Sequence, residues 1–229
     1  MADRVPDIPA SCAARPVIGG LVVPYVNVRL RDGGVDFRAA DNTRYERVWT
    51  NRLCQTCGGP VGELAVFFGG PNQLAARRFD EPHVCPPCAV YVSKACPMVS
   101  GRLAAYADRE HLADGRRGQV CPDPGCGCGG WVETVAGDNA GGAPAHPWYA
   151  VYVPAGGWVL TADQVTTTVN NKPVTRTVIN GGLLTAAPRK VVHVSEPGVG
   201  RVWARTVLPP QDPDACTRDK PPKENSCPV

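Results

Sequence analysis

Two Cys-x-x-Cys pairs constrain the fold of this 229-residue chain more than any other feature of its sequence. The first pair lies in RLCQTCGG, and the second lies in EPHVCPPCA about 30 positions later. A Zn²⁺ ion takes four thiolate or imidazole ligands in a tetrahedron, and a Cys-x-x-Cys turn aims two thiolates at one point. The sequence therefore predicts one structural zinc site with four ligands: Cys54, Cys57, Cys85 and Cys88.

The residues around the two pairs indicate how the chain presents them. The first pair is followed by a Gly58-Gly59-Pro60 turn and by ELAVFF, which is typical of a strand. GGPNQ then predicts a turn into a second strand near Phe79. Pro86 and Pro87 fit the first turn of a helix, where missing amide hydrogens are tolerated. A knuckle, a β-hairpin and a helix that supplies the last two ligands form the layout of a treble-clef zinc finger.

The helix dipole favours thiolates at this helix start, and two cysteines three positions apart lie on one face of its first turn. His83 precedes them and offers an alternative ligand to Cys85. Cys96 lies two helical turns beyond Cys88, which favours a small buried thiol rather than a ligand.

A second cysteine group has three thiols in eight residues, one ligand short of a closed site. The group comprises Cys121, Cys126 and Cys128, and the candidates for its fourth ligand are Cys96, His111 and His146. It either binds a second zinc ion or is a loop with spare cysteines. The pattern assigns no role to the three remaining thiols, Cys12, Cys216 and Cys227.

Eleven cysteines, an odd number, favour metal binding in a reducing cytosol over a secreted disulfide framework, which is the alternative. The start, MADRVPDIPASC, lacks the basic region and apolar run of a secretory signal. The most apolar run, PVIGGLVVPYVNV, is too short to span a bilayer. We therefore expect a cytoplasmic protein that does not contact membranes.

Local patterns predict an α+β fold with short elements, since 24 Pro and 25 Gly make up about a fifth of the chain. LVVPYVNVRLRDGGVDFRA predicts a hairpin, and DNTRYERVWT predicts a helix capped by Asp41 or Asn42. Residues 147–208 carry short β-rich runs that predict a small antiparallel sheet or partial barrel. The expected organisation is a zinc-binding module at 1–100, a Gly/Pro/Cys-rich loop or insertion at 101–146, the β-rich part at 147–208 and a disordered tail at 209–229.

Charge limits the partners. Residues 1–146 carry 15 basic and 15 acidic residues, whereas residues 147–229 carry nine and six. The half of the chain that holds the paired cysteines is thus neutral overall, which argues against strong nonspecific binding to nucleic acid. The excess of three positive charges in the second part allows a weak patch, formed by Lys172, Arg176, Arg189, Lys190, Arg201 and Arg205. An unidentified protein partner is therefore the main expectation, and weak nucleic-acid binding is the alternative.

Several stretches resemble, in order, a group of uncharacterised proteins found in bacterial genomes, phages and prophages. They are DIPA, VPYV, DFRAAD, RLCQTCGGPVG, FFGGP, EPHVCPPCAVYVSKACPMVSG and HVSEPGVGRVWA. The match spans most of residues 7–205 and is strongest over 35–101. These relatives carry histidine or cysteine where this chain has Cys85, which implies a metal ligand there. The insert around Cys121 departs from the family, and the cell-envelope-biogenesis label that some members carry finds no support in these residues.

These observations favour a non-enzymatic, phage-related interaction module with a structural zinc ion. A treble-clef endonuclease of the His-Asn-His class is a further alternative, because FDEPH places Asp80, Glu81 and His83 ahead of the second cysteine pair. Such an enzyme needs a general-base histidine and polar ligands for magnesium.

Overall fold

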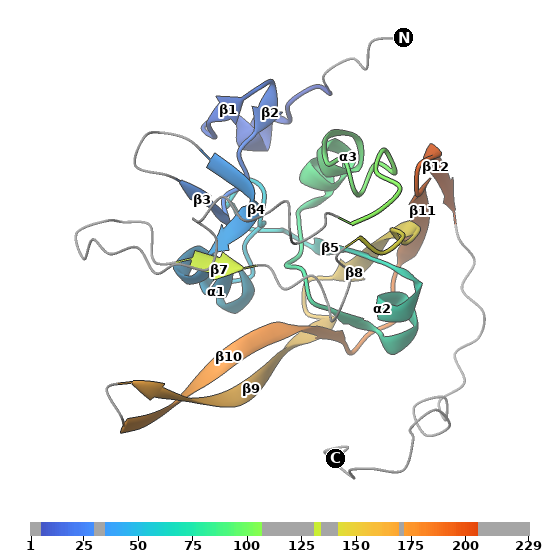
Figure 1. The fold of residues 1–229 in the computed structure, drawn as a ribbon. Coiled ribbons are helices and arrows are strands. Elements are labelled where there is room, and N and C mark those ends of the chain that lie inside the picture. Colours follow the sequence, from blue (N-terminus) through green and yellow to red (C-terminus); the bar gives the residue numbers. More distant parts are fainter. Residues whose placement is uncertain (1–5, 30–34, 107–130, 134–141, 170–171, 206–229) are drawn as a thin grey trace.

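A computed structural model describes residues 6–29, 35–106, 131–133, 142–169 and 172–205 (Figure 1). Within these residues, three α-helices accompany four sheets whose strand pairs are all antiparallel. The mixed α+β class predicted from the sequence is confirmed. The second cysteine group and the predicted disordered tail lie outside the described residues.

A four-stranded sheet forms the centre of the molecule, with strand order β12-β11-β8-β5. Its strands are β5 (Leu64–Gly69), β8 (Trp148–Pro154), β11 (Lys190–Glu196) and β12 (Gly200–Arg205). β5 is the predicted ELAVFF strand, and its partner along its whole length is β8. One sheet therefore joins the strand after the first cysteine pair to the β-rich segment far along the chain.

The expected β-hairpin between the cysteine pairs does not form as predicted. GGPNQ begins a short helix, α2 (Pro71–Ala76), and the prediction of a turn there was wrong. Pro71 occupies the first helical position, and the Gly70 amide donates to Gln73 Oε1 over 3.1 Å, which together start the helix. β6 (Arg78–Phe79) then pairs with a later strand, β10, so β5 and β6 are not hydrogen-bonded neighbours.

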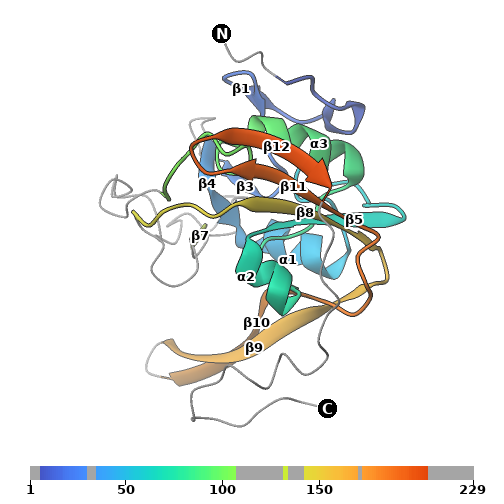
Figure 2. The same cartoon turned by 90° about the vertical axis from the view of Figure 1, so that its right-hand side faces the viewer.

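Two long strands project from the body as a hairpin (Figures 1 and 2). They are β9 (Trp158–Val169) and β10 (Lys172–Leu184), and with β6 they form a three-stranded sheet. The sequence runs GWVLTA and TTTVNN, which read as separate short strands, belong largely to the single strand β9. Cross-strand hydrogen bonds such as Thr166 to Thr175 at 2.8 Å connect exposed side chains of this hairpin.

The predicted hairpin and the predicted capped helix both form in the N-terminal part, although Leu21 and Val22, expected in the hairpin, belong to a separate strand pair. β3 (Asn27–Arg29) and β4 (Val35–Asp41) form the predicted antiparallel pair, and β7 (Trp131–Glu133) extends their sheet. Asp41 caps α1 (Asn42–Thr50) by accepting a 3.0 Å hydrogen bond from the Arg44 amide. Before them lie a 3-10 helix, η1 (Ala10–Cys12), and the small pair β1 (Val17–Ile18) and β2 (Leu21–Val22).

The core is centred on an aromatic cluster that joins distant segments. Trp49 of α1 packs against Phe67 of β5 and Trp158 of β9, with ring centroids 6.2 and 5.6 Å apart. Phe79 and His83 complete the cluster, and all five side chains are fully buried. Among the described residues, no helix is long and apolar enough to cross a membrane.

Candidate metal centre

The first cysteine pair sits on a tight knuckle made by backbone hydrogen bonds. The Gly58 amide donates to the Cys54 carbonyl over 2.8 Å, and the Cys54 amide donates to the Gly59 carbonyl over 2.7 Å. The Cys57 amide also points to Cys54 Sγ, 3.5 Å away. Backbone amides aimed at sulfur offset the charge of a thiolate, so the turn is suited to a metal ligand.

Gly58 is required for this turn on two grounds. Its φ of +80° lies in the left-handed region, and a Cβ atom there would lie 2.7 Å from Tyr25 Cδ2. Gly58→Ala is therefore expected to destabilise the protein by at least about 1–2 kcal/mol and to weaken metal binding. Chemical unfolding of the metal-saturated protein measures the effect.

Gly59→Ala is the matched control for that prediction. A Cβ atom at Gly59 would make only ordinary contact with Cys57 Sγ, at 3.6 Å, and the backbone there is not left-handed. Equal stability of the two alanine variants would show that the knuckle does not constrain Gly58.

The second cysteine pair sits at the start of α3 (Pro86–Ala95), as predicted. Cys85 is the residue before the first turn, and Cys88 lies within that turn. Two contacts bring this helix start to the knuckle. Val84 exchanges 2.9 Å backbone hydrogen bonds with Val66 of β5, and the Gln55 amide donates to the His83 carbonyl over 3.1 Å.

The four predicted cysteines meet in one cluster. All four Sγ atoms lie within 4.8 Å of one another, and Cys57 Sγ is 4.0 Å from Cys85 Sγ. Four sulfur atoms that each lie about 2.3 Å from one tetrahedral zinc ion are about 3.8 Å apart from one another. The sulfur–sulfur distances in the cluster are close to that value and therefore suit a metal ion. Cys57 is half-buried, whereas the other three are buried. The cluster can therefore hold a metal ion between a closed set of thiolates.

The thiols strongly influence one another's ionisation. Hydrogen bonding with Cys54 lowers the pKa of Cys57, and it lowers the pKa of Cys85 to about 7. The same mutual contacts raise the pKa of Cys54 and Cys88, chiefly through Cys57 for the first and through Cys54 for the second. Four adjacent thiolates repel one another, so a bound cation is what allows all four to ionise together.

The alternative ligands lie elsewhere. His83 is fully buried in the aromatic cluster, with its ring centroid 4.6 Å from that of Trp158, and burial lowers its pKa to about 4. It is not part of the sulfur cluster. Of the fourth-ligand candidates for the second cysteine group, Cys96 directly follows α3, the ring of His146 packs against Tyr106 at 5.9 Å, and His111 lies outside the described residues.

Cys12 is the residue at this centre that the sequence pattern missed. Its Sγ atom lies 3.6 Å from Cys88 Sγ, and its side chain is 1% exposed. The neighbouring Ser11 Oγ lies 3.5 Å from the same sulfur. No local spacing marks Cys12, because the nearest cysteine in the sequence is Cys54, 42 positions later. Only the packing of η1 against α3 brings it to the cluster.

Comparisons with family models, curated proteins and solved structures find no match to this chain.

Proposed function

We propose that Cys54, Cys57, Cys85 and Cys88 bind one structural Zn²⁺ ion between a knuckle and a helix start, as in a treble clef but without its β-hairpin, and that the protein is a non-enzymatic interaction module of phage or prophage origin. The observation that carries the proposal is the convergence of four sulfur atoms within 4.8 Å. An all-cysteine set is the ligand type of structural zinc, and four thiolates leave no open position for water or substrate. The metal then stabilises the fold and a protein surface carries the function.

Zinc titration of the reduced, metal-free protein tests this proposal. We expect one equivalent of Zn²⁺ to restore protease resistance to residues 41–100, because the metal supplies about 10 kcal/mol or more of folding free energy in small zinc modules. The buried Trp49 and Trp158 report the same transition by fluorescence. Full protease resistance in the metal-free protein would contradict a structural role for zinc.

The proposal does not extend to an endonuclease. A general base must reach its substrate, whereas the His83 side chain is fully buried behind aromatic rings. The carboxylate of Asp80 accepts a 3.0 Å hydrogen bond from Gln73 Nε2 rather than joining His83 in an open site. These contacts support a core role for Phe79 and His83, whereas Asp80 and Glu81 are exposed.

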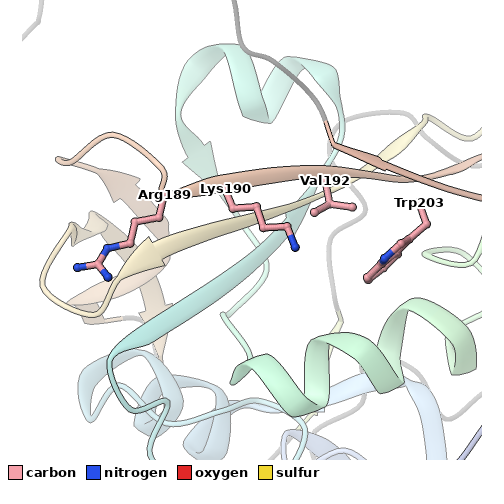
Figure 3. A pocket seen from close by; sticks show the side chains of 4 residues that line it. All are labelled: Arg189, Lys190, Val192 and Trp203. Carbon is pink, nitrogen blue, oxygen red and sulfur yellow. The ribbon is translucent and has the colours of Figure 1, made fainter.

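A second candidate function, weak binding of single-stranded nucleic acid, has one observation in its favour. Arg189, Lys190, Val192 and Trp203 line an open pocket of about 490 Å³ on β11 and β12 (Figure 3). The Trp203 side chain is 43% exposed, and Lys190 Nζ lies 5.2 Å from the Tyr152 ring centroid. An exposed indole can stack on a base while neighbouring cations contact phosphate.

Binding of an oligothymidylate at two salt concentrations tests this candidate. Trp203→Ala is expected to weaken binding about 5- to 150-fold, the effect of losing roughly 1–3 kcal/mol of stacking. Affinity must also fall as salt rises, because phosphate contacts release counterions. Phe37→Ala, which removes an exposed aromatic ring on β4, is the matched control. Salt-independent binding, or equal loss in both variants, would argue against a nucleotide site at Trp203.

A further inference from the structure

The N-terminal 3-10 helix brings two hydrogen-bonding side chains to one metal ligand. Ser11 Oγ and Cys12 Sγ lie 3.5 and 3.6 Å from Cys88 Sγ. Cys12 is almost completely buried there, so its S–H group is shielded from water. The contact connects η1 to the first turn of α3, across 76 positions of sequence.

Metal binding would fix the direction of both hydrogen bonds. A cysteine that coordinates zinc does so as a thiolate, which carries no proton and can only accept. The Cys12 thiol and the Ser11 hydroxyl must then donate to Cys88. Four thiolates around one divalent ion carry a net charge of −2 in a largely buried site, and hydrogen bonds to the sulfurs spread that charge.

The same N-terminal segment also contacts the other parts of the centre. The Val22 amide donates to the Tyr91 hydroxyl of α3 over 2.8 Å. The Tyr25 amide donates to the Thr56 carbonyl within the knuckle over 2.9 Å, and the Tyr25 ring packs against Gly58. The segment from Ala10 to Tyr25 therefore reaches both cysteine turns.

We infer that Cys12, with Ser11, is a positioning residue of the metal centre, which donates a hydrogen bond to the Cys88 thiolate and so couples metal binding to docking of residues 9–25 on α3. The inference rests on the proposed zinc site and adds hydrogen bonds from Ser11 and Cys12 to one of its ligands. Loss of the metal would loosen the knuckle and the first turn of α3, the two places that this segment contacts, and would release the segment. The bond after Leu21, inside this segment, then becomes accessible to chymotrypsin.

Cobalt substitution of the full-length protein tests the inference. Co²⁺ replaces zinc in thiolate sites, and its sulfur-to-metal absorption bands report the electron density on each thiolate. Cys12→Ala should still bind one Co²⁺ through four thiolates. Its bands should move to lower energy, because a thiolate without a donor is more electron-rich. Zinc affinity, measured by chelator competition, should fall about 10- to 100-fold.

Three further variants make the test decisive. Cys12→Ser keeps a donor and should restore the band position and most of the affinity. Ser11→Ala changes an exposed residue, which preserves folding, and should give a smaller shift in the same direction. Cys96→Ala, at the far end of α3, should leave both readouts unchanged. Chymotrypsin should cleave after Leu21 sooner in zinc-bound Cys12→Ala than in the zinc-bound wild type.

Two results would overturn the inference. A Cys12→Ala protein with unchanged bands and unchanged affinity would show that Cys12 only fills space. Loss of about a quarter of the sulfur-to-metal absorbance in that variant would show that Cys12 is itself a ligand. A wild-type protein that binds neither Co²⁺ nor Zn²⁺ would instead overturn the proposed zinc site, so the two failures are distinguishable.

Discussion

Replacing Cys88 with serine is expected to abolish zinc binding and to unfold the segment from α1 to α3. Structural zinc contributes about 10–16 kcal/mol in zinc-finger peptides, comparable with the about 5–15 kcal/mol that stabilises a typical folded domain. Cys88 is fully buried, so the variant also places a weaker ligand among three thiols that repel one another when ionised. Zinc content per chain and proteolysis of residues 41–100 measure the two effects.

Cys57→Ser should have the same consequence, although Cys57 is the half-buried member of the cluster. The matched control is Cys96→Ser, because Cys96 directly follows the helix that carries Cys88 and lies outside the sulfur cluster. The control should retain one zinc ion and protease resistance. A Cys88→Ser protein that kept both zinc and protease resistance would contradict the structural role assigned to the site.

Trp49→Ala is expected to produce the second largest loss, about 3–5 kcal/mol of unfolding free energy. The Trp49 side chain is fully buried and its ring contacts four others, with centroids 5.6–6.3 Å apart. These rings come from α1, β5, β9 and the loop before α3. Because one cluster joins these elements, they should unfold in a single transition. Urea unfolding of the zinc-saturated protein, followed by fluorescence and circular dichroism, measures the loss.

Trp203→Ala serves as the control for Trp49→Ala, since Trp203 is 43% exposed and its removal leaves no buried cavity. The effect of the control should stay within about 0.5 kcal/mol. If Trp49→Ala unfolded the β9–β10 hairpin separately from the rest, the aromatic cluster would not be the shared core.

The sequence alone predicted those features whose determining residues lie close together in the chain. The Cys-x-x-Cys spacing marks each cysteine pair, Asp41 caps α1 through a residue three positions away, and Pro86 and Pro87 begin α3. The ambiguity between His83 and Cys85 could not be resolved in this way, because both fit the local spacing. Burial among aromatic rings separates them, and burial depends on segments far away in the sequence.

The features that the sequence pattern missed depend on packing between segments that are far apart in the chain. β5 reads correctly as a strand, but nothing in its residues specifies β8 as its partner. GGPNQ contains turn residues, yet Pro71 and Gln73 also suit the first turn of a helix, and α2 forms. Cys12 has no spacing signal at all, and only the packing of η1 against α3 places its thiol beside Cys88.

The central claim, that four cysteines hold one structural zinc ion, is tested most directly by native mass spectrometry of the purified protein. The mass should exceed that of the polypeptide by one zinc ion under native conditions and should fall to the polypeptide mass after acid release. A second ion would add a site at Cys121, Cys126 and Cys128. A chain that carries no metal, and that takes up none when zinc is supplied to its reduced form, would contradict the account.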